Sequence, residues 1–481
     1  MRYWIAFAVC AIAATVPLLV TPTLPMVDLP EHMAQVAIWK HLHDACHGYA
    51  EIYELNFATA YLLGYLVMRA FAAFVTVSTA AKLTVWLSVI LLPLSMRALL
   101  RRTGGDVWLS LLGFLLAYGY VFYWGFLNFA LAVPLGILSL ALLYDERPRL
   151  VAMSALALFV LASHALLFVF VAMVTLLVAA VRRMPRLLVP LVVPALLFAA
   201  FVLRLQQAEP TSQGVFSWGR SAFGRLGDFP WLLVANAWEP WGVAIFLAIA
   251  MAVLVAWPRI TREGARWIPL LLAAGIYLFG PFGAFGSDYL YARFAALVSI
   301  GALMVLEAPR RAVTLSRVLI VMLVLGWMGV LTGRFHRFGL EVADYDRLIA
   351  SIPVNRRIVH FNVEPFSEHV PGPVYFHFGA LYQVRQGGLL AWSFANNYPQ
   401  LVRYRKGAEP VVNSRSTPRT GVDWPGILQY DYILVRGGDP RPWLLRHAPV
   451  PIVTEARVGE WWRLATPRAR GPQQDCPPLN E

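Results

Sequence analysis

Eleven runs of apolar residues constrain this chain more than any other feature. As a helix, each run can cross the ~30 Å hydrocarbon layer of a bilayer or most of it. Inside that layer every backbone polar group needs an internal hydrogen bond, which a helix provides. The sequence therefore predicts a polytopic α-helical membrane protein with about eleven spans, at residues 4–20, 79–98, 107–123, 126–144, 150–163, 165–181, 187–204, 232–256, 267–283, 289–307 and 316–333.

The composition agrees with a chain whose main solvent is lipid. Only 14% of the residues are charged, whereas about a quarter are charged in soluble domains. The net charge of +13 does not indicate a nucleic-acid partner, because the Arg residues form short clusters between apolar runs. Three Cys residues exclude a disulfide framework and a Cys-based zinc site. The run 4–20 lacks a convincing cleavage site, which favours an uncleaved first span over a signal peptide.

The basic clusters predict the topology. Cytoplasmic loops are enriched in Lys and Arg, so all five clusters are placed in the cytoplasm. The segment 57–97 must then cross the membrane an odd number of times. We interpret 79–98 as the span and 57–75 as a helix at the outer interface, where Arg69 reaches the headgroups; a hairpin of two spans is the alternative. The clusters are Arg97/Arg101/Arg102, Arg147/Arg149, Arg182/Arg183/Arg186, Arg259/Arg262/Arg266 and Arg310/Arg311/Arg317.

The sequence changes character after residue 333. It becomes mixed polar and apolar, rich in Pro and Gly, with strand-like runs at 357–363, 430–436 and 455–464 and a helix-like stretch before Gly387. We predict a membrane domain over 1–333, with the first outer loop and interfacial helices at 21–78, and a periplasmic α/β domain over 334–481.

The first outer loop concentrates ionisable side chains. Asp28, Glu31 and His32 fall within about one helical turn, and Pro30 suits the start of a helix with Asp28 near its N-cap. One interpretation is an acidic cap on an amphipathic interfacial helix. The other is chemistry, because neighbouring carboxylates and an imidazole can provide a general base or hold a divalent cation. The residues alone leave both open.

Three further candidates lie at predicted outer ends of spans. His164 is most simply a headgroup contact, but its predicted depth matches that of Asp28, which leaves a shared cation or substrate phosphate open. Arg293 follows Asp288 at the start of the run 289–307. An Arg inside the membrane edge is costly unless it is paired. A structural Arg–Asp tie is one interpretation, and a grip on a phosphate is the other, because guanidinium matches phosphate oxygens in a bidentate manner.

Tyr123 and Trp124 form another outer turn, where aromatic rings commonly mark the interface and also stack on sugars. Asn128 is a polar residue in an apolar run and is expected to bond a neighbouring helix. Cys46 and Cys476 both fall on the predicted outer side. An oxidising compartment permits a bridge between them, and two free thiols are the alternative.

This layout resembles the GT-C class of membrane glycosyltransferases, which includes the protein mannosyltransferases, the aminoarabinose transferases of lipid A and the GPI mannosyltransferases. The likeness lies in a first span, an outer loop with an acidic motif, an interfacial helix and a span ending in Arg-rich sequence, mainly over residues 21–144. Asn56–Tyr61 stands where the class often has His-Pro-Pro-Leu-Tyr, without the prolines. The resemblance implies Asp28 as catalytic base.

The resulting hypothesis is an inverting transferase in a bacterial inner membrane. The resemblance implies a polyprenyl-phosphate sugar donor, with an acceptor that the sequence does not identify. Arg293 would hold the lipid phosphate, and Asp288, Tyr123, Trp124 and Asn128 would line the site. Glu31, His32 and His164 would orient substrates or bind a cation, Mn²⁺ or Mg²⁺. The rival hypotheses are a transporter or flippase for a lipid-linked or anionic substrate, and an assembly factor that acts through its outer domain.

Overall fold

The computed structural model describes residues 1–208, 216–234, 239–255, 258–284, 287–308, 314–410, 422–471 and 476–479. By its internal contacts the chain divides into two compact units. Unit 1 is Met1–Leu18, Ala58–Gly64 and Val85–Thr332; unit 2 is Leu19–Phe57, Tyr65–Thr84 and Gly333–Glu481. The first outer loop thus groups with the C-terminal residues. The predicted domains 1–333 and 334–481 follow chain order and remain a prediction.

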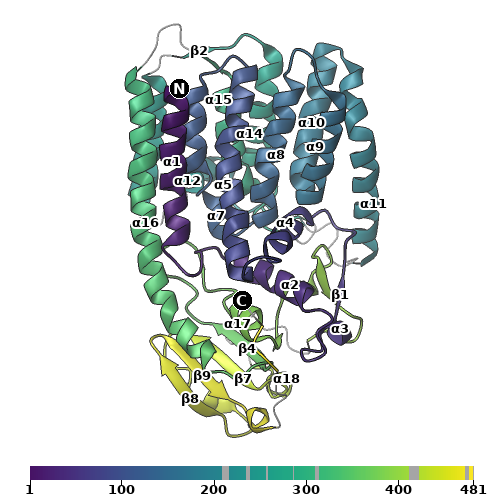
Figure 1. Ribbon diagram of the computed structural model, residues 1–481, viewed down its shortest axis with the longest axis vertical. Helices are drawn as coiled ribbons and strands as arrows, with labels where there is room; N and C mark the ends of the chain where they lie inside the picture. Colours follow the sequence, from purple (N-terminus) through teal and green to yellow (C-terminus); the bar gives the residue numbers. More distant parts are fainter. Residues whose placement is uncertain are drawn as a thin grey trace. The chain divides into compact units, whose positions relative to one another are not determined.

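Apolar helices make up unit 1, and α8 (Leu127–Leu143), α9 (Leu150–Ser163) and α10 (Ala165–Arg182) run side by side in it (Figure 1). In the described chain, six helical segments are long and apolar enough to cross a membrane. They are α1 (Arg2–Leu19), α5 (Val77–Arg102), Val107–Trp124 with α6 (Gly113–Leu116) and α7 (Tyr120–Trp124), α10 (Ala165–Arg182), Pro185–Ala208 with α11 (Val192–Ala208), and α16 (Thr314–Ala350).

Shorter apolar helices complete the set. They are α8 (Leu127–Leu143), α9 (Leu150–Ser163), Gly242–Leu254 within α13 (Glu239–Leu254), Gly264–Phe279 with α14 (Ile268–Phe279), and Tyr291–Met304 with α15 (Ala295–Met304). Each of the eleven predicted runs overlaps one helical segment of these two groups. The predicted fold class, a polytopic α-helical membrane protein with a C-terminal sheet region, is confirmed.

Some unit 1 helices carry apolar side chains on their outer faces. On α11, Val193, Leu196 and Leu197 are each more than half exposed. Water would disfavour a patch of this kind, whereas lipid tails solvate it. These faces are therefore suited to contact with the bilayer.

The C-terminal part of unit 2 contains a five-stranded mixed sheet. Its order is β5–β4–β7–β9–β8; β4 pairs in parallel with β5 and β7, while β9 runs antiparallel to β7 and β8. The three predicted strand-like runs and the predicted helix are confirmed. The strands are β4 (Arg357–Asn362), β5 (Leu389–Leu390), β7 (Tyr432–Arg436), β8 (Val453–Val458) and β9 (Trp461–Ala465), and the helices are α17 (Gly379–Gln386) and α18 (Trp424–Ile427).

The alternation of side chains along β4 separates the sheet core from a candidate site. Val359 and Phe361 point into a buried apolar cluster together with Ile433 of β7. Because successive side chains of a strand point to opposite faces, His360 and Asn362 lie on the other face, where they line a pocket. The packing of one face therefore fixes the direction of the polar residues on the other.

The first outer loop is folded into unit 2 by pairing with the C-terminal part of the chain. Strand β1 (Tyr53–Leu55), after the short helix α3 (Tyr49–Ile52), pairs antiparallel with β6 (Val402–Tyr404). The amide of Gln35 bonds both the N–H and the carbonyl of Val402, at 2.6 and 3.3 Å.

Helix α2 (Leu29–Lys40) corrects one expectation. Every residue from Leu29 to Ile38 is buried, so this stretch exposes no polar face to water, unlike the amphipathic helix predicted here. Its location at the membrane interface remains a prediction. Helix α17 packs against it. Segments distant in the sequence cover the side that local periodicity assigned to water or headgroups.

Within the segment 57–75 the structure contains helix α4 (Leu63–Phe71). At 1.5 Å per residue, nine residues extend only ~14 Å, far short of the ~30 Å that a span needs. This length agrees with the interpretation of 57–75 as a non-spanning segment. The guanidinium of Arg69 lies 5.8 Å from the ring centroid of Trp39, within unit 2.

Cys46 and Cys476 form a disulfide, with their Cα atoms 5.6 Å apart. The sequence left this pairing open. The bond joins the first outer loop to the C-terminal tail across 430 residues of chain, and a cross-link over so long a loop strongly restricts the unfolded state.

We expect reduction of this disulfide to destabilise unit 2. Native disulfides typically contribute about 2–4 kcal/mol, which corresponds to a fall in unfolding midpoint of roughly 5–15 °C. Thermal unfolding of the detergent-solubilised protein, with and without dithiothreitol, measures the effect. Cys46→Ser should match the reduced wild type, whereas Cys10→Ser, which removes the buried free thiol of α1, should still respond to the reductant. An equal midpoint in both redox states would contradict this expectation.

Candidate functional site

The N-terminus of α2 carries the first group of candidate residues. Pro30 stands in the first turn, as predicted, and Asp28 occupies the N-cap position. Its side chain makes no capping hydrogen bond, so the simple capping interpretation does not account for this carboxylate. The side chain is instead directed to an imidazole from a distant part of unit 2.

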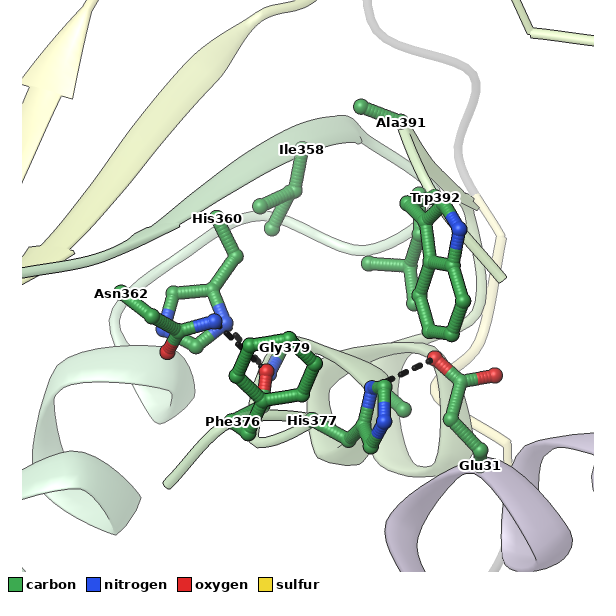
Figure 2. Close-up of a pocket in the computed structure, with 11 residues that line it drawn as sticks. Glu31, Ile358, His360, Asn362, Phe376, His377, Gly379, Ala391 and Trp392 are labelled. Atoms are coloured by element: carbon green, nitrogen blue, oxygen red, sulfur yellow. Dashed lines mark hydrogen bonds and ion pairs between the residues drawn. The ribbon is translucent and has the colours of Figure 1, made fainter. Parts of the chain in front are cut away.

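That imidazole belongs to His377, just before α17. Its Nε2 lies 3.5 Å from Oδ1 of Asp28, and its Nδ1 lies 3.9 Å from Oε1 of Glu31. The ring stacks on Trp392, with centroids 4.7 Å apart and planes at 18°, and meets Phe394 edge-on. Figure 2 shows His377 beside Trp392 with Glu31 across from it. One imidazole therefore lies between two carboxylates, one on each ring nitrogen.

The two carboxylates differ in their surroundings. Glu31 is held by protein donors, because its Oε2 accepts the backbone N–H of Phe394 at 2.9 Å and the hydroxyl of Ser393 at 3.2 Å. Its side chain is 2% exposed and that of His377 is 6% exposed, whereas that of Asp28 is 17% exposed. Of these three groups, Asp28 has the most exposed side chain.

His32 points to a different set of groups. Its Nδ1 lies 2.8 Å from the hydroxyl of Tyr65, which donates to Oε1 of Gln400. Burial, together with the carboxylates of Glu31 and Asp28, raises the pKa of Tyr65 well above its ordinary value, so the hydroxyl keeps its proton. Because that proton is used on Gln400, His32 must donate from Nδ1. The predicted neighbours Glu31 and His32 thus have different partners.

A small pocket opens beside His377 and is lined by Glu31, His360, Asn362, Phe376 and Trp392, among others (Figure 2). Burial lowers the pKa of His360 to about 3, so the ring is neutral, and its Nδ1 accepts the N–H of Gly379. The remaining proton is on Nε2. The cavity of about 30 Å³ has room for one or two water molecules, not for a sugar ring.

Unit 1 holds the second group of candidates, where Arg293 and His164 come together. Nη1 of Arg293 lies 3.1 Å from Nε2 of His164, and Nη2 donates to the carbonyl oxygen of Asp288 at 3.0 Å. The guanidinium also lies 3.8 Å from the ring centroid of Phe126. The Arg–Asp contact is therefore made through the Asp288 backbone, and Asp288 itself is exposed.

The contacts of His164 determine its protonation. The ring sits between α9 and α10, where Nδ1 lies 3.2 Å from the N–H of Leu166. Guanidinium and backbone N–H are both donors, and a protonated imidazole can accept from neither. The ring is therefore neutral, and at any moment it accepts from one of the two donors.

The remaining unit 1 candidates have structural contacts. Trp124 packs on Tyr289 with ring centroids 4.2 Å apart, and Tyr123 is buried. Oδ1 of Asn128 accepts the N–H of Gly64 at 2.9 Å, a bond to a neighbouring segment of the kind expected. None of these contacts tests a role in substrate binding.

The predicted cation site gains no support from the described residues. They contain no group of three His, Cys, Asp or Glu side chains arranged to hold a metal ion. Metal binding by Glu31, His32 and His164 remains a prediction.

Sequence reasoning missed His377 and Trp392. The only local signal was an ionisable residue among the aromatics of Tyr375–Phe378, just before the predicted helix. Nothing in that signal indicates Asp28 as the neighbour, because the two are brought together by the packing of α17 on α2.

No protein-family model and no curated protein sequence matches the chain. Among solved structures, the chain is similar to ArnT from Cupriavidus metallidurans bound to undecaprenyl phosphate, with 12% identity, a TM-score of 0.44 and coverage of 98% of this chain and 99% of that one. The apo state of the same ArnT gives 12% identity, a TM-score of 0.41 and 98% coverage of each chain. At this level of similarity, function has to be inferred from the residues themselves.

Proposed function

We propose that the chain is a membrane glycosyltransferase of GT-C type that moves a sugar from a polyprenyl-phosphate donor to a periplasmic or lipid acceptor. The observation that carries the proposal is the group at the start of α2. There a partly exposed carboxylate, Asp28, is held by a buried imidazole that a second carboxylate orients. An N-cap that makes no capping bond and faces an ionisable network is suited to proton transfer.

Asp28 would act as the general base. It would accept the proton of the acceptor hydroxyl while the acceptor oxygen bonds to the anomeric carbon of the sugar. The bond from that carbon to the phosphate oxygen breaks, and polyprenyl phosphate leaves with the electron pair. General base catalysis of this kind typically contributes 10²–10⁴-fold.

Arg293 would bind the phosphate of the donor. Its guanidinium is buried on the ring of Phe126, and the neutral ring of His164 lies beside it without adding charge. A guanidinium keeps its positive charge in a protein interior, and it fits phosphate oxygens. These residues do not identify the molecule that accepts the sugar. We propose that the sheet of unit 2 helps to select it.

The proposed location is a bacterial inner membrane, with unit 2 in the periplasm. In that topology residue 69 faces the periplasm and the exposed Arg101, at the end of α5, faces the cytoplasm. In intact cells, a membrane-impermeant maleimide should therefore label Arg69→Cys in a Cys10→Ser background and should label Arg101→Cys only after lysis. Labelling of position 69 from the cytoplasmic side alone would overturn the topology.

A flippase for a lipid-linked substrate is the competing function. Purified protein in proteoliposomes with a donor radiolabelled in the sugar separates the two. A transferase moves the label from the polyprenyl lipid to the acceptor fraction. A flippase leaves the label on intact lipid and changes only its accessibility from each side of the bilayer. Transbilayer movement with no new glycosidic product would overturn the proposal.

A further inference from the structure

We propose that His377 is a positioning residue for Asp28: its imidazole orients the Asp28 carboxylate and receives the proton that Asp28 takes from the acceptor. The inference rests on the proposed function for the substrate, but its core is a coupling between two side chains that is measurable without any substrate. It assigns a role in the reaction to a residue from the C-terminal part of the chain.

The ring of His377 has a fixed orientation. It is 6% exposed, stacked on Trp392 and met edge-on by Phe394. Glu31, anchored by the Phe394 N–H and the Ser393 hydroxyl, lies on the Nδ1 side. The same packing turns Nε2 toward Oδ1 of Asp28. The stack and the anchored carboxylate therefore select which nitrogen meets the base.

The proposed proton transfer requires one tautomer of the neutral ring. Only the tautomer that carries its proton on Nδ1, the side of Glu31, offers a lone pair at Nε2 to Asp28. In that tautomer Nε2 and Oδ1 of Asp28, which lie 3.5 Å apart, can share one added proton. The proposal therefore treats Asp28 and His377 as a pair that holds this proton between them.

The step balances as follows. The acceptor hydroxyl loses its proton to Asp28 as its oxygen bonds to the anomeric carbon and polyprenyl phosphate departs. The proton then moves from Asp28 to Nε2 of His377, which restores the carboxylate. The resulting imidazolium lies between two carboxylates, which stabilise its charge. The proton then leaves to solvent past the partly exposed side chain of Asp28. This returns Asp28 to the carboxylate and His377 to the neutral ring.

Among the described residues, Asp28 and Glu31 from α2 lie within ion-pair distance of His377, His32 of α2 contacts the same Phe394 ring, and His360 from β4 lines the same pocket. His360 shares the pocket but bonds the Gly379 N–H instead of a carboxylate. It is therefore a matched control: a buried imidazole of the same pocket that is outside the proposed proton path.

The coupling is tested by solid-state NMR of the full chain, labelled with ¹⁵N-histidine and reconstituted in liposomes. His377→Gln identifies the signal of the ring. We expect Asp28→Asn to move the titration midpoint of His377 to lower pH by about one unit or more, because a neighbouring negative charge is removed. Glu51→Gln, at an exposed acid on α3, should leave the midpoint unchanged. An unchanged midpoint in Asp28→Asn would overturn the proposal.

The kinetic consequence is measured as sugar transfer against pH. His377→Gln should lower kcat by roughly 10- to 100-fold with little change in KM, and should alter the acidic limb of the pH profile. His360→Gln should lower stability and keep the wild-type pH profile. Combining His377→Gln with Asp28→Asn should be no worse than Asp28→Asn alone, because the two residues act as one unit. Multiplicative losses would overturn the proposal.

The two proposals fail in different ways. If wild-type protein shows no transfer but Asp28 and His377 remain coupled by NMR, the proposed function is wrong and the paired groups are real. If transfer occurs and depends on Asp28, but His377→Gln keeps the wild-type kcat and pH profile, the role of His377 is wrong and the function stands.

Discussion

Asp28→Asn should reduce kcat/KM for sugar transfer by about 10²–10⁴-fold, the range that a general base typically contributes. The amide has the shape of the carboxylate but cannot accept the acceptor's proton. Because Asp28 makes no capping bond at α2, the helix loses no cap, and the unfolding midpoint should stay within a few degrees of the wild type. Initial rates with purified protein and a polyprenyl-phosphate sugar measure the effect.

Glu51→Gln is the control for this substitution. Glu51 is an exposed acid in the same unit, so its neutralisation changes the local charge equally without touching the α2 group. Activity of Glu51→Gln should match that of the wild type. A wild-type rate in Asp28→Asn would show that this carboxylate is not the base.

Arg293→Lys should weaken binding of the polyprenyl-phosphate donor by roughly 10- to 100-fold. Lysine keeps the charge but loses the planar fork that meets two phosphate oxygens, and hydrogen bonds to charged groups contribute about 1.5–3 kcal/mol. The measurement is donor affinity by thermal shift of purified protein, with polyprenyl alcohol as the uncharged comparison ligand. The alcohol should shift wild type and variant equally.

Arg225→Lys separates donor binding from folding. Arg225 is also buried in unit 1 and packs its guanidinium on Tyr291 at 3.8 Å, but its donors are used on backbone carbonyls, including those of Tyr277 and Gly280. This variant should lose stability and keep its affinity for the donor. Equal loss of donor affinity in both variants, or none in Arg293→Lys, would contradict the assigned role.

Local chemistry made the fold of the spans and strands predictable. Lipid requires long apolar helices, so the runs identified the spans. The strand-like runs 430–436 and 455–464 identified β7, β8 and β9. The sequence also indicated that His164 and Arg293 belong to one region, since both sit at the predicted outer ends of spans. Their contact at 3.1 Å agrees with that expectation.

Long-range packing accounts for what the sequence did not reveal. Helix α2 has the local pattern of an interfacial helix, but α17 covers it. The same packing brings His377 to Asp28, and no periodicity encodes that contact. The pairing of β1 with β6 and the Cys46–Cys476 bond likewise join segments at opposite ends of the chain.

The chemical fate of the donor tests the central claim most directly. Purified wild-type protein would be incubated in proteoliposomes with a polyprenyl-phosphate sugar and a membrane-lipid extract as the source of acceptor, and the products quantified by mass spectrometry. We predict that polyprenyl phosphate and a glycosylated acceptor appear in equal amounts, and that both are reduced at least a hundredfold with Asp28→Asn. Intact donor with wild-type protein, or equal product with both proteins, would contradict the account.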